Sequence, residues 1–112
     1  MSREYRLYLD DMLEAKARIQ EYTDKMTYKE FTQSKITIDA VIRNLEVIGE
    51  TARKLPPEIK KKSPEIEWRK IVAMRNVLTH EYFGVNTQIV WDVVQNKIEL
   101  LGRFCQTLLK GA

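Results

Sequence analysis

The chain has 112 residues, of which 19 are Lys or Arg and 16 are Asp or Glu, so its formal net charge is +3. A hydrophobic fraction of 44% with 31% charged residues is typical of one soluble globular domain over residues 1–112, and excludes a disordered chain or a membrane protein. One Cys and one His exclude an internal disulfide and a zinc site, so we expect no metal and no cofactor. The N-terminal residues lack the apolar region of a signal peptide, and we expect a cytoplasmic protein.

The first half of the chain contains two long helical patterns. Apolar residues recur every three or four positions over about residues 3–24, which predicts a first helix. The same period over about residues 34–54 predicts a second helix. The two stripes consist of Tyr5, Tyr8, Met12, Ala15, Ile19, Tyr22 and Met26, and of Ile38, Val41, Leu45, Ile48, Ala52 and Leu55.

The second half predicts two further helices. Pro56 and Pro57 end the second helix, because proline cannot continue it and disfavours helical backbone in the residue before it. A short helical turn is expected over 57–62, followed by a third helix over about 67–82. Gly84 is a natural C-terminal cap and Asn86 a natural N-cap for a fourth helix over about 87–109.

Four helices with short connections predict an all-α fold, an antiparallel four-helix bundle. The fourth helix carries two adjacent apolar stripes, wider than one core-facing side requires. Either this helix is central in the bundle, or its second face meets another subunit. We expect the second arrangement, because symmetric dimers are the commonest oligomers. The stripes consist of Val90, Val94, Ile98, Leu101, Cys105 and Leu108, and of Ile89, Val93, Leu100 and Phe104.

The positive charge is unevenly distributed. Residues 1–55 hold ten basic and ten acidic side chains, whereas residues 56–112 hold nine and six, so the whole +3 lies in the second half. Such a cluster is either a solvated face or a docking surface for phosphates. The densest window contains Lys60, Lys61, Lys62, Arg69, Lys70 and Arg75 against only Glu65 and Glu67.

One short stretch, residues 74–84, concentrates groups that can do chemistry. It holds the single His80, with Arg75 five residues earlier and Tyr82 two residues later. On a continuous helix Arg75 and Tyr82 share a face, and His80 points about 140° away from Arg75. Arg can hold a phosphate, and His can deprotonate a ribose 2′-OH so that it attacks the adjacent phosphate. From spacing alone, His80 is either catalytic or an ordinary helix-terminal histidine.

At these residues the chain resembles a known family. Arg75-x4-His80-x-Tyr82 is similar to the signature of HEPN-domain ribonucleases, in the extended form found in HepT-like toxins. The resemblance continues over residues 37–56, 67–86 and 89–96, and so covers nearly the whole chain. Supporting positions are Asn44, Gly49, Glu50, Trp68, Phe83, Gly84, Trp91 and Asp92.

The resemblance implies a dimeric helical bundle and a metal-independent endoribonuclease, with the Arg and His of both chains in one composite cleft. It implies the role of a toxin, with tRNA or mRNA as substrate. The partner would be a minimal nucleotidyltransferase antitoxin of the MntA type, which neutralises the toxin by adding AMP to the motif tyrosine. Arg75 would stabilise the phosphate, His80 would act as acid and base, and Tyr82 would be modified.

Several residues keep two interpretations. Asn76 either orients the RNA backbone or caps a local turn. Glu50 either positions Arg75 or His80, or pairs at the surface with Arg53 or Lys54. Arg69 and Lys70 are candidate RNA contacts from the basic cluster. The two tryptophans, Trp68 and Trp91, are expected in the core or an interface rather than as base-stacking platforms.

Two other function classes stay open. A HEPN-like domain that has lost catalysis could bind nucleotides or proteins, although the intact pair of Arg75 and His80 argues against it. The chain could alternatively be a structural partner that inhibits a nucleotidyltransferase. An RNA cleavage assay separates these possibilities from the enzyme.

Overall fold

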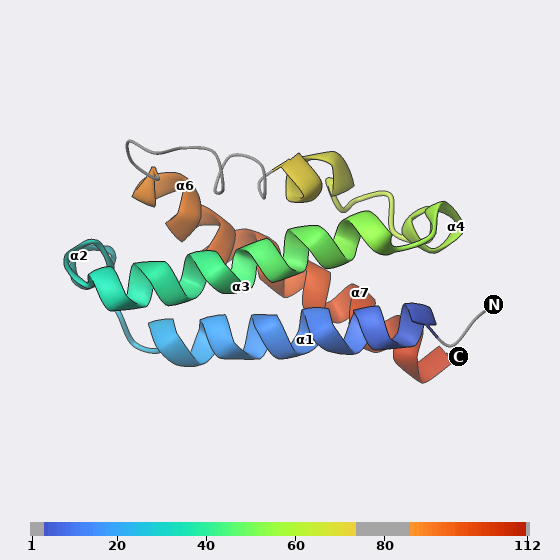
Figure 1. Ribbon diagram of the computed structural model, residues 1–112, viewed down its shortest axis with the longest axis horizontal. Coiled ribbons are helices and arrows are strands. Elements are labelled where there is room, and N and C mark those ends of the chain that lie inside the picture. The colour runs from blue at the N-terminus through green and yellow to red at the C-terminus, as the bar shows by residue number, and fades with distance from the viewer. Residues whose placement is uncertain (1–3, 74–85, 112) are drawn as a thin grey trace.

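A computed structural model describes residues 4–73 and 86–111, all of whose regular structure is helical. Helix α1 spans Glu4–Thr23 and α3 spans Lys35–Lys54. The two lie side by side in antiparallel orientation, and the C-terminal helix crosses against them (Figure 1). The predicted all-α bundle is therefore confirmed. None of the described helices is long and apolar enough to cross a bilayer.

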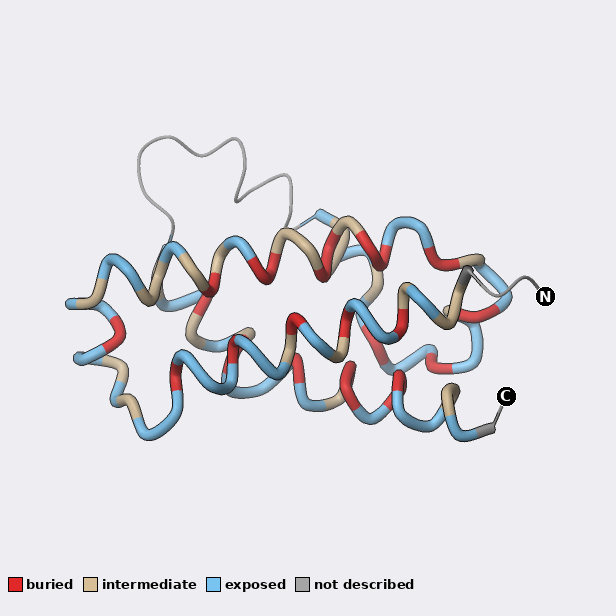
Figure 2. The backbone as a smooth tube through the Cα atoms, turned by 60° about the horizontal axis from the view of Figure 1, so that its bottom comes forward, coloured by how far each residue is buried: buried red, intermediate tan, exposed pale blue. Residues whose placement is uncertain are grey.

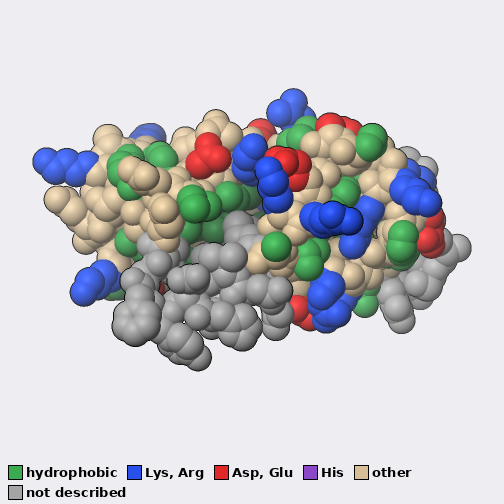
Figure 3. All heavy atoms as spheres, turned by 90° about the horizontal axis from the view of Figure 1, so that it is seen from above, with side chains coloured by type: hydrophobic (Ala, Val, Ile, Leu, Met, Phe, Trp, Pro, Cys, Tyr) green, Lys and Arg blue, Asp and Glu red, His purple; other side chains and the backbone are tan. Residues whose placement is uncertain are grey.

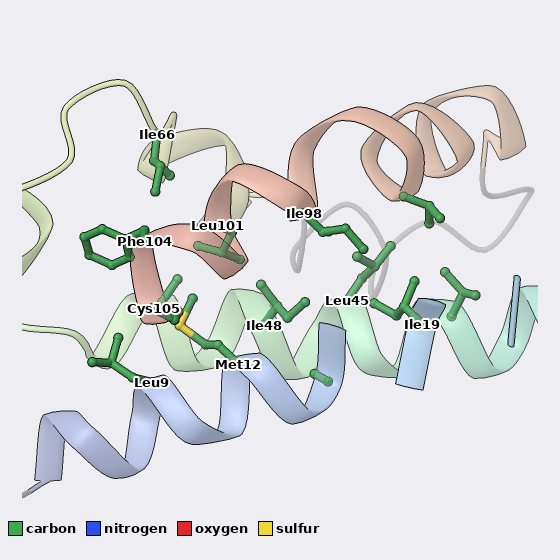
Figure 4. Packing of buried hydrophobic residues seen from close by; sticks show 14 of the residues in the cluster. Leu9, Met12, Ile19, Leu45, Ile48, Ile66, Ile98, Leu101, Phe104 and Cys105 are labelled. Carbon is green, nitrogen blue, oxygen red and sulfur yellow. The ribbon is translucent and has the colours of Figure 1, made fainter. Parts of the chain in front are cut away.

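The buried core lies where α1, α3 and the C-terminal helix meet. Leu9 and Met12 from α1 belong to the same buried cluster as Ile48 from α3 and as Leu101 and Cys105 from the C-terminal helix (Figure 4). In Figure 2 the buried positions recur along one side of each long helix, as the 3.6-residue period requires. Cys105 is fully buried, as expected from its place on the stripe.

Helix α3 follows the predicted stripe closely. Val41, Leu45, Ile48 and Ala52 are all buried. Its C-cap residue, Leu55, has φ −65° and ψ 136°, so the helix ends where the following proline disfavours helical backbone. Helix α4 then forms the expected short turn at Pro57–Lys60.

The end of α1 differs from the sequence prediction. Tyr22, assigned to the apolar stripe, is 39% exposed, whereas Thr23 is buried. The Thr23 hydroxyl donates to the carbonyl of Ile19 at 2.8 Å, which satisfies the polar group inside the helix. The buried face thus passes through Thr23, while Tyr22 remains partly exposed.

An additional helix, α2 at Tyr28–Gln33, forms in the connection between the first two predicted helices. Thr27 and Glu30 form a capping box: the Thr27 side chain accepts from the Glu30 amide, and the Glu30 carboxylate accepts from the Thr27 amide. Phe31 anchors the helix, since its ring is fully buried in the core.

The fourth predicted helix is present but is not uniform. Helix α6 spans Thr87–Asp92, a π-helical segment η1 spans Val93–Lys97, and α7 spans Ile98–Gly111. Within η1 the amide of Ile98 donates to the carbonyl of Val93, five residues back. Successive buried residues here are four apart, a spacing that drifts by about 40° per step on an ideal α-helix. The wider π turn compensates for that drift and keeps Val90, Val94 and Ile98 in the core.

Candidate functional site

The sequence-predicted residues Arg75, Asn76, His80 and Tyr82 lie outside the described residues. The expected helix over 67–82 is helical at 68–73, where its description ends, and the expected C-cap Gly84 also falls in the part not described. The structure does define the two segments that enter and leave this stretch, and the surface between them.

The entering segment is helix 68–73, held at its start by Trp68. The half-buried indole stands edge-on to Phe104 of α7, with ring centroids 5.0 Å apart and planes at 67°. Its Nε1 donates to the backbone carbonyl of Lys60 at 3.2 Å. Further along the helix, Ile71 and Val72 pack against the core cluster. Trp68 is therefore a packing residue, as expected.

The leaving segment is fixed by a cap and by aromatic packing. Asn86 accepts hydrogen bonds from the amides of Gln88 and Ile89 and so begins α6, confirming the predicted N-cap. One residue later, the Thr87 hydroxyl lies 3.0 Å from the hydroxyl of Tyr28 on α2. The other tryptophan, Trp91, packs against Tyr28 and Phe31, its ring centroid 5.0 Å from that of Phe31.

A groove of about 570 Å³ separates helix 68–73 from the α6–η1–α7 helix. Its lining is mainly apolar and includes Ile71, Ile89, Val93 and Leu100. Three of these, Ile89, Val93 and Leu100, belong to the second stripe of the fourth predicted helix, and Ile89 is 59% exposed. That stripe is thus divided: Phe104 is buried in the core, while the other three face the groove.

Charged residues also line this groove. The Glu67 carboxylate lies 2.7 Å from the ammonium of Lys70 and 3.7 Å from that of Lys97, so it joins helix 68–73 to η1. The hydrogen bond from Lys70, followed by its charge, lowers the pKa of Glu67; the same contact raises the pKa of Lys70. The candidate RNA contact Lys70 is therefore ion-paired, whereas Arg69 beside it is exposed.

Glu50 lies on α3 with its carboxylate half-buried. Oε1 accepts from Arg53 at 2.6 Å, and this contact raises the pKa of Arg53. The ion pair with Arg53 anticipated for Glu50 is present. Oε2 is shielded from solvent. A positioning role toward Arg75 or His80 stays a prediction.

Two residues that line the groove are not among the sequence-predicted site residues. They are Asn96 and Lys97; the apolar period indicates neither of them, and Asn96 is only the last residue of the resembling stretch 89–96. Their placement depends on the π turn, in which Asn96 donates to Asp92 at 2.7 Å. Within residues 4–73 and 86–111, no cluster of three or more His, Cys, Asp or Glu could hold a metal ion.

Comparisons with known proteins now identify the family. The family described as "Ribonuclease HepT-like" matches residues 12–108. The "Probable ribonuclease HepT" of Thermococcus cleftensis is 41% identical over 105 residues, covering 93% of this chain and 96% of that protein. "Putative RNase MJ0127" of Methanocaldococcus jannaschii is 43% identical over 96 residues, covering 86% of this chain and 79% of that protein. No solved structure matches significantly. The resemblance carried by the Arg75–Tyr82 stretch is thereby confirmed, and the chain belongs to the HepT-like ribonuclease family.

Proposed function

We propose that this protein is a metal-independent endoribonuclease that acts as the toxin of a toxin–antitoxin pair. The observation that carries the proposal is the motif Arg75-x4-His80-x-Tyr82, intact in a chain that matches the HepT-like ribonuclease family over residues 12–108. The substrate is RNA, either tRNA or mRNA, in the cytoplasm. A non-catalytic binding module would have no use for both Arg75 and His80.

The chemistry follows from the two side chains. His80 takes the proton of a ribose 2′-OH, and the 2′-oxygen forms a bond to the adjacent phosphorus. The bond from phosphorus to the 5′-oxygen breaks, and that oxygen leaves with a proton supplied by an imidazolium. Arg75 holds the non-bridging oxygens and stabilises the charge that develops on them. The products are a 2′,3′-cyclic phosphate and a 5′-hydroxyl.

A symmetric dimer would supply the second histidine. Each chain has a single His, whereas the reaction needs a base and an acid. The exposed Ile89 and the apolar lining of the groove, on the α6–η1–α7 helix, support an interface on this face. In a two-fold dimer both subunits contribute the same face to the interface. Residues beside the groove of one subunit would therefore lie close to the groove of the other subunit. His80 of the partner subunit would then act as the acid. Light scattering that finds a monomer at micromolar concentration would contradict this arrangement.

The supporting residues have narrower roles in the proposal. Arg69 is exposed and available to an RNA phosphate, whereas Lys70 would first have to leave Glu67. Asn76 would orient the RNA backbone. Glu50 would position Arg75 or His80 from α3, with Arg53 as its ion-pair partner.

Cleavage of total RNA by the purified, unmodified protein in the presence of EDTA tests the enzyme. We expect His80→Ala and Arg75→Ala each to lose on the order of a hundredfold or more in rate while staying folded. A 2′-deoxy sugar at the cut site should block cleavage. Products with a 3′-hydroxyl, or activity abolished by EDTA, would contradict the mechanism.

Tyr82 is the proposed off-switch. A nucleotidyltransferase antitoxin of the MntA type would add AMP to its phenolic oxygen. The added phosphodiester can occupy the Arg75 guanidinium, and the adenosine fills space that RNA needs. Co-expression with such a partner should increase the mass by AMP units and abolish RNA cleavage, and Tyr82→Phe should prevent both effects. A partner that silences Tyr82→Phe as well as the wild type would mean that inhibition works by binding alone.

A further inference from the structure

One end of the molecule carries an excess of positive charge, of which the proposed function uses only Arg69 and Lys70 as RNA contacts. Residues 53–70 contain seven Lys and Arg against three Glu, a net charge of +4, so the rest of the chain sums to −1. We call five of these cations the α4 basic surface; they are Lys54, Lys60, Lys61, Lys62 and Arg69. Figure 3 shows several Lys and Arg side chains, with Asp and Glu among them, on the half of the molecule where α4 lies.

The fold brings these five residues from three segments to one place. Lys54 ends α3, and after the two prolines α4 begins immediately. Ile59 is fully buried and fixes α4 against the core, so the lysines that follow it turn toward solvent; Lys61 and Lys62 are exposed. The hydrogen bond from the Trp68 indole to the Lys60 carbonyl then joins helix 68–73, with Arg69, to α4.

The three carboxylates of residues 53–70 offset only part of this positive charge; one of them, the exposed Glu58, lies in the first turn of α4 itself. Glu67 is held by Lys70 and Lys97, and Glu65 accepts a hydrogen bond from the Ser63 hydroxyl at 2.6 Å. Among the described residues, no ion pair involves any of the five cations. Lys60 is half-buried, and this desolvation lowers its pKa, so an incoming anion would stabilise its charged form.

The position of this surface relative to the proposed site favours RNA as its partner. Arg69 precedes Arg75 by six residues, so the covalent chain limits the distance between their Cα atoms to about 21 Å. An RNA strand bound at Arg75 could therefore continue onto α4 over several nucleotides. Lysines act as point charges without a fixed geometry, which suits binding to a sugar–phosphate backbone irrespective of sequence.

We infer that the α4 basic surface binds the backbone phosphates of the RNA substrate outside the cleavage site. This inference rests on the proposed ribonuclease function and adds to it a second point of contact. Short substrates that reach only the cleavage site would not use this contact, whereas longer RNA would bind more tightly. The affinity gained in this way should depend strongly on salt.

The test is the binding of an uncleavable 2′-O-methyl RNA of roughly 20 nucleotides to full-length protein at several salt concentrations. The triple variant Lys60→Gln/Lys61→Gln/Lys62→Gln removes three cations. For a single strand, the slope of log affinity against log salt should become shallower by about 2, and affinity at 0.1 M salt should fall on the order of a hundredfold. Replacing the three lysines by Arg should restore both values.

The chain offers a matched control at the opposite end of α3. Lys25, Lys29 and Lys35 are exposed and take part in no ion pair with described residues. Their triple Gln variant changes the net charge equally and should lower affinity by less than about threefold. If both triple variants weaken binding equally, the effect is one of net charge and the inference is wrong.

Further measurements keep binding and catalysis distinguishable. The α4 triple variant should cleave a trinucleotide at the wild-type rate but a long RNA with a raised KM. If wild-type protein binds RNA in this way but cleaves nothing, the proposed function fails and the surface stands. If the α4 triple variant binds RNA normally but no longer binds the nucleotidyltransferase, the surface is a protein interface and the inference is overturned.

Should the triple variant unfold, the exposed Lys61→Gln and Lys62→Gln single variants should each reduce the slope of log affinity against log salt by about 0.7.

Discussion

We predict that Trp68 contributes strongly to the stability of helix 68–73, the segment that precedes the proposed catalytic residues in the chain. Its half-buried ring shields about 100 Å² of apolar surface, which corresponds to roughly 2.5 kcal/mol. The Nε1 hydrogen bond to the Lys60 carbonyl adds about 1 kcal/mol. That carbonyl also accepts from the Ser63 amide, so removing the indole N–H leaves it with a partner.

Two substitutions separate these contributions. Trp68→Phe keeps an aromatic ring but loses the donor, and should reduce the free energy of unfolding by about 1 kcal/mol. Trp68→Ala loses both contributions, about 3.5 kcal/mol in total. For a domain of 112 residues each kcal/mol corresponds to about 4 °C in Tm, so the expected decreases are about 4 °C and about 15 °C.

Thermal and urea unfolding followed by circular dichroism would measure these values. A double-mutant cycle with Phe104→Leu should also give a coupling of about 1 kcal/mol for the edge-on ring contact. If Trp68→Phe is as destabilising as Trp68→Ala, ring packing is not the main contribution. If neither variant changes stability, the anchoring role is refuted.

Three further predictions concern Cys105 and the two residues of the α2 capping box. Burial, with a smaller contribution from Asp10, raises the pKa of the Cys105 thiol to about 12. At pH 8 its reaction with a thiol reagent should therefore be on the order of a thousandfold slower in the native protein than in urea. Equal rates in the two conditions would contradict the burial of Cys105. Thr27→Ala should cost about 1 kcal/mol in urea unfolding. The hydrogen bonds from Thr27 lower the pKa of Glu30, so their stabilising effect is present above the ordinary pKa of Glu30 and is lost as pH falls through the lowered value. Glu30→Gln should therefore flatten the acid dependence of the unfolding midpoint, and an unchanged dependence would exclude this linkage.

Local sequence signals are sufficient to predict the two long helices α1 and α3 and the residue at which α3 ends. Lys35–Lys54 was predictable because its apolar residues repeat with the helical period and because two prolines follow directly, both of which are local signals. The N-cap at Asn86 was predictable for the same reason. The motif from Arg75 to Tyr82, together with the resemblance over residues 37–56, 67–86 and 89–96, indicates the family without any structure, since both depend only on residue types at fixed spacing.

Other features of the described residues depend on contacts between segments that are far apart in the chain. Helix α2 has its own capping box, but its place depends on Phe31 packing against Trp91 and on the contact between Tyr28 and Thr87, residues far apart in the chain. The π turn at Val93–Lys97 likewise depends on core packing. In a uniform α-helix, buried residues spaced four apart would rotate progressively away from the core. The groove and the α4 basic surface form where segments separated in the sequence lie side by side, and the local period of apolar residues does not predict which segments contact each other.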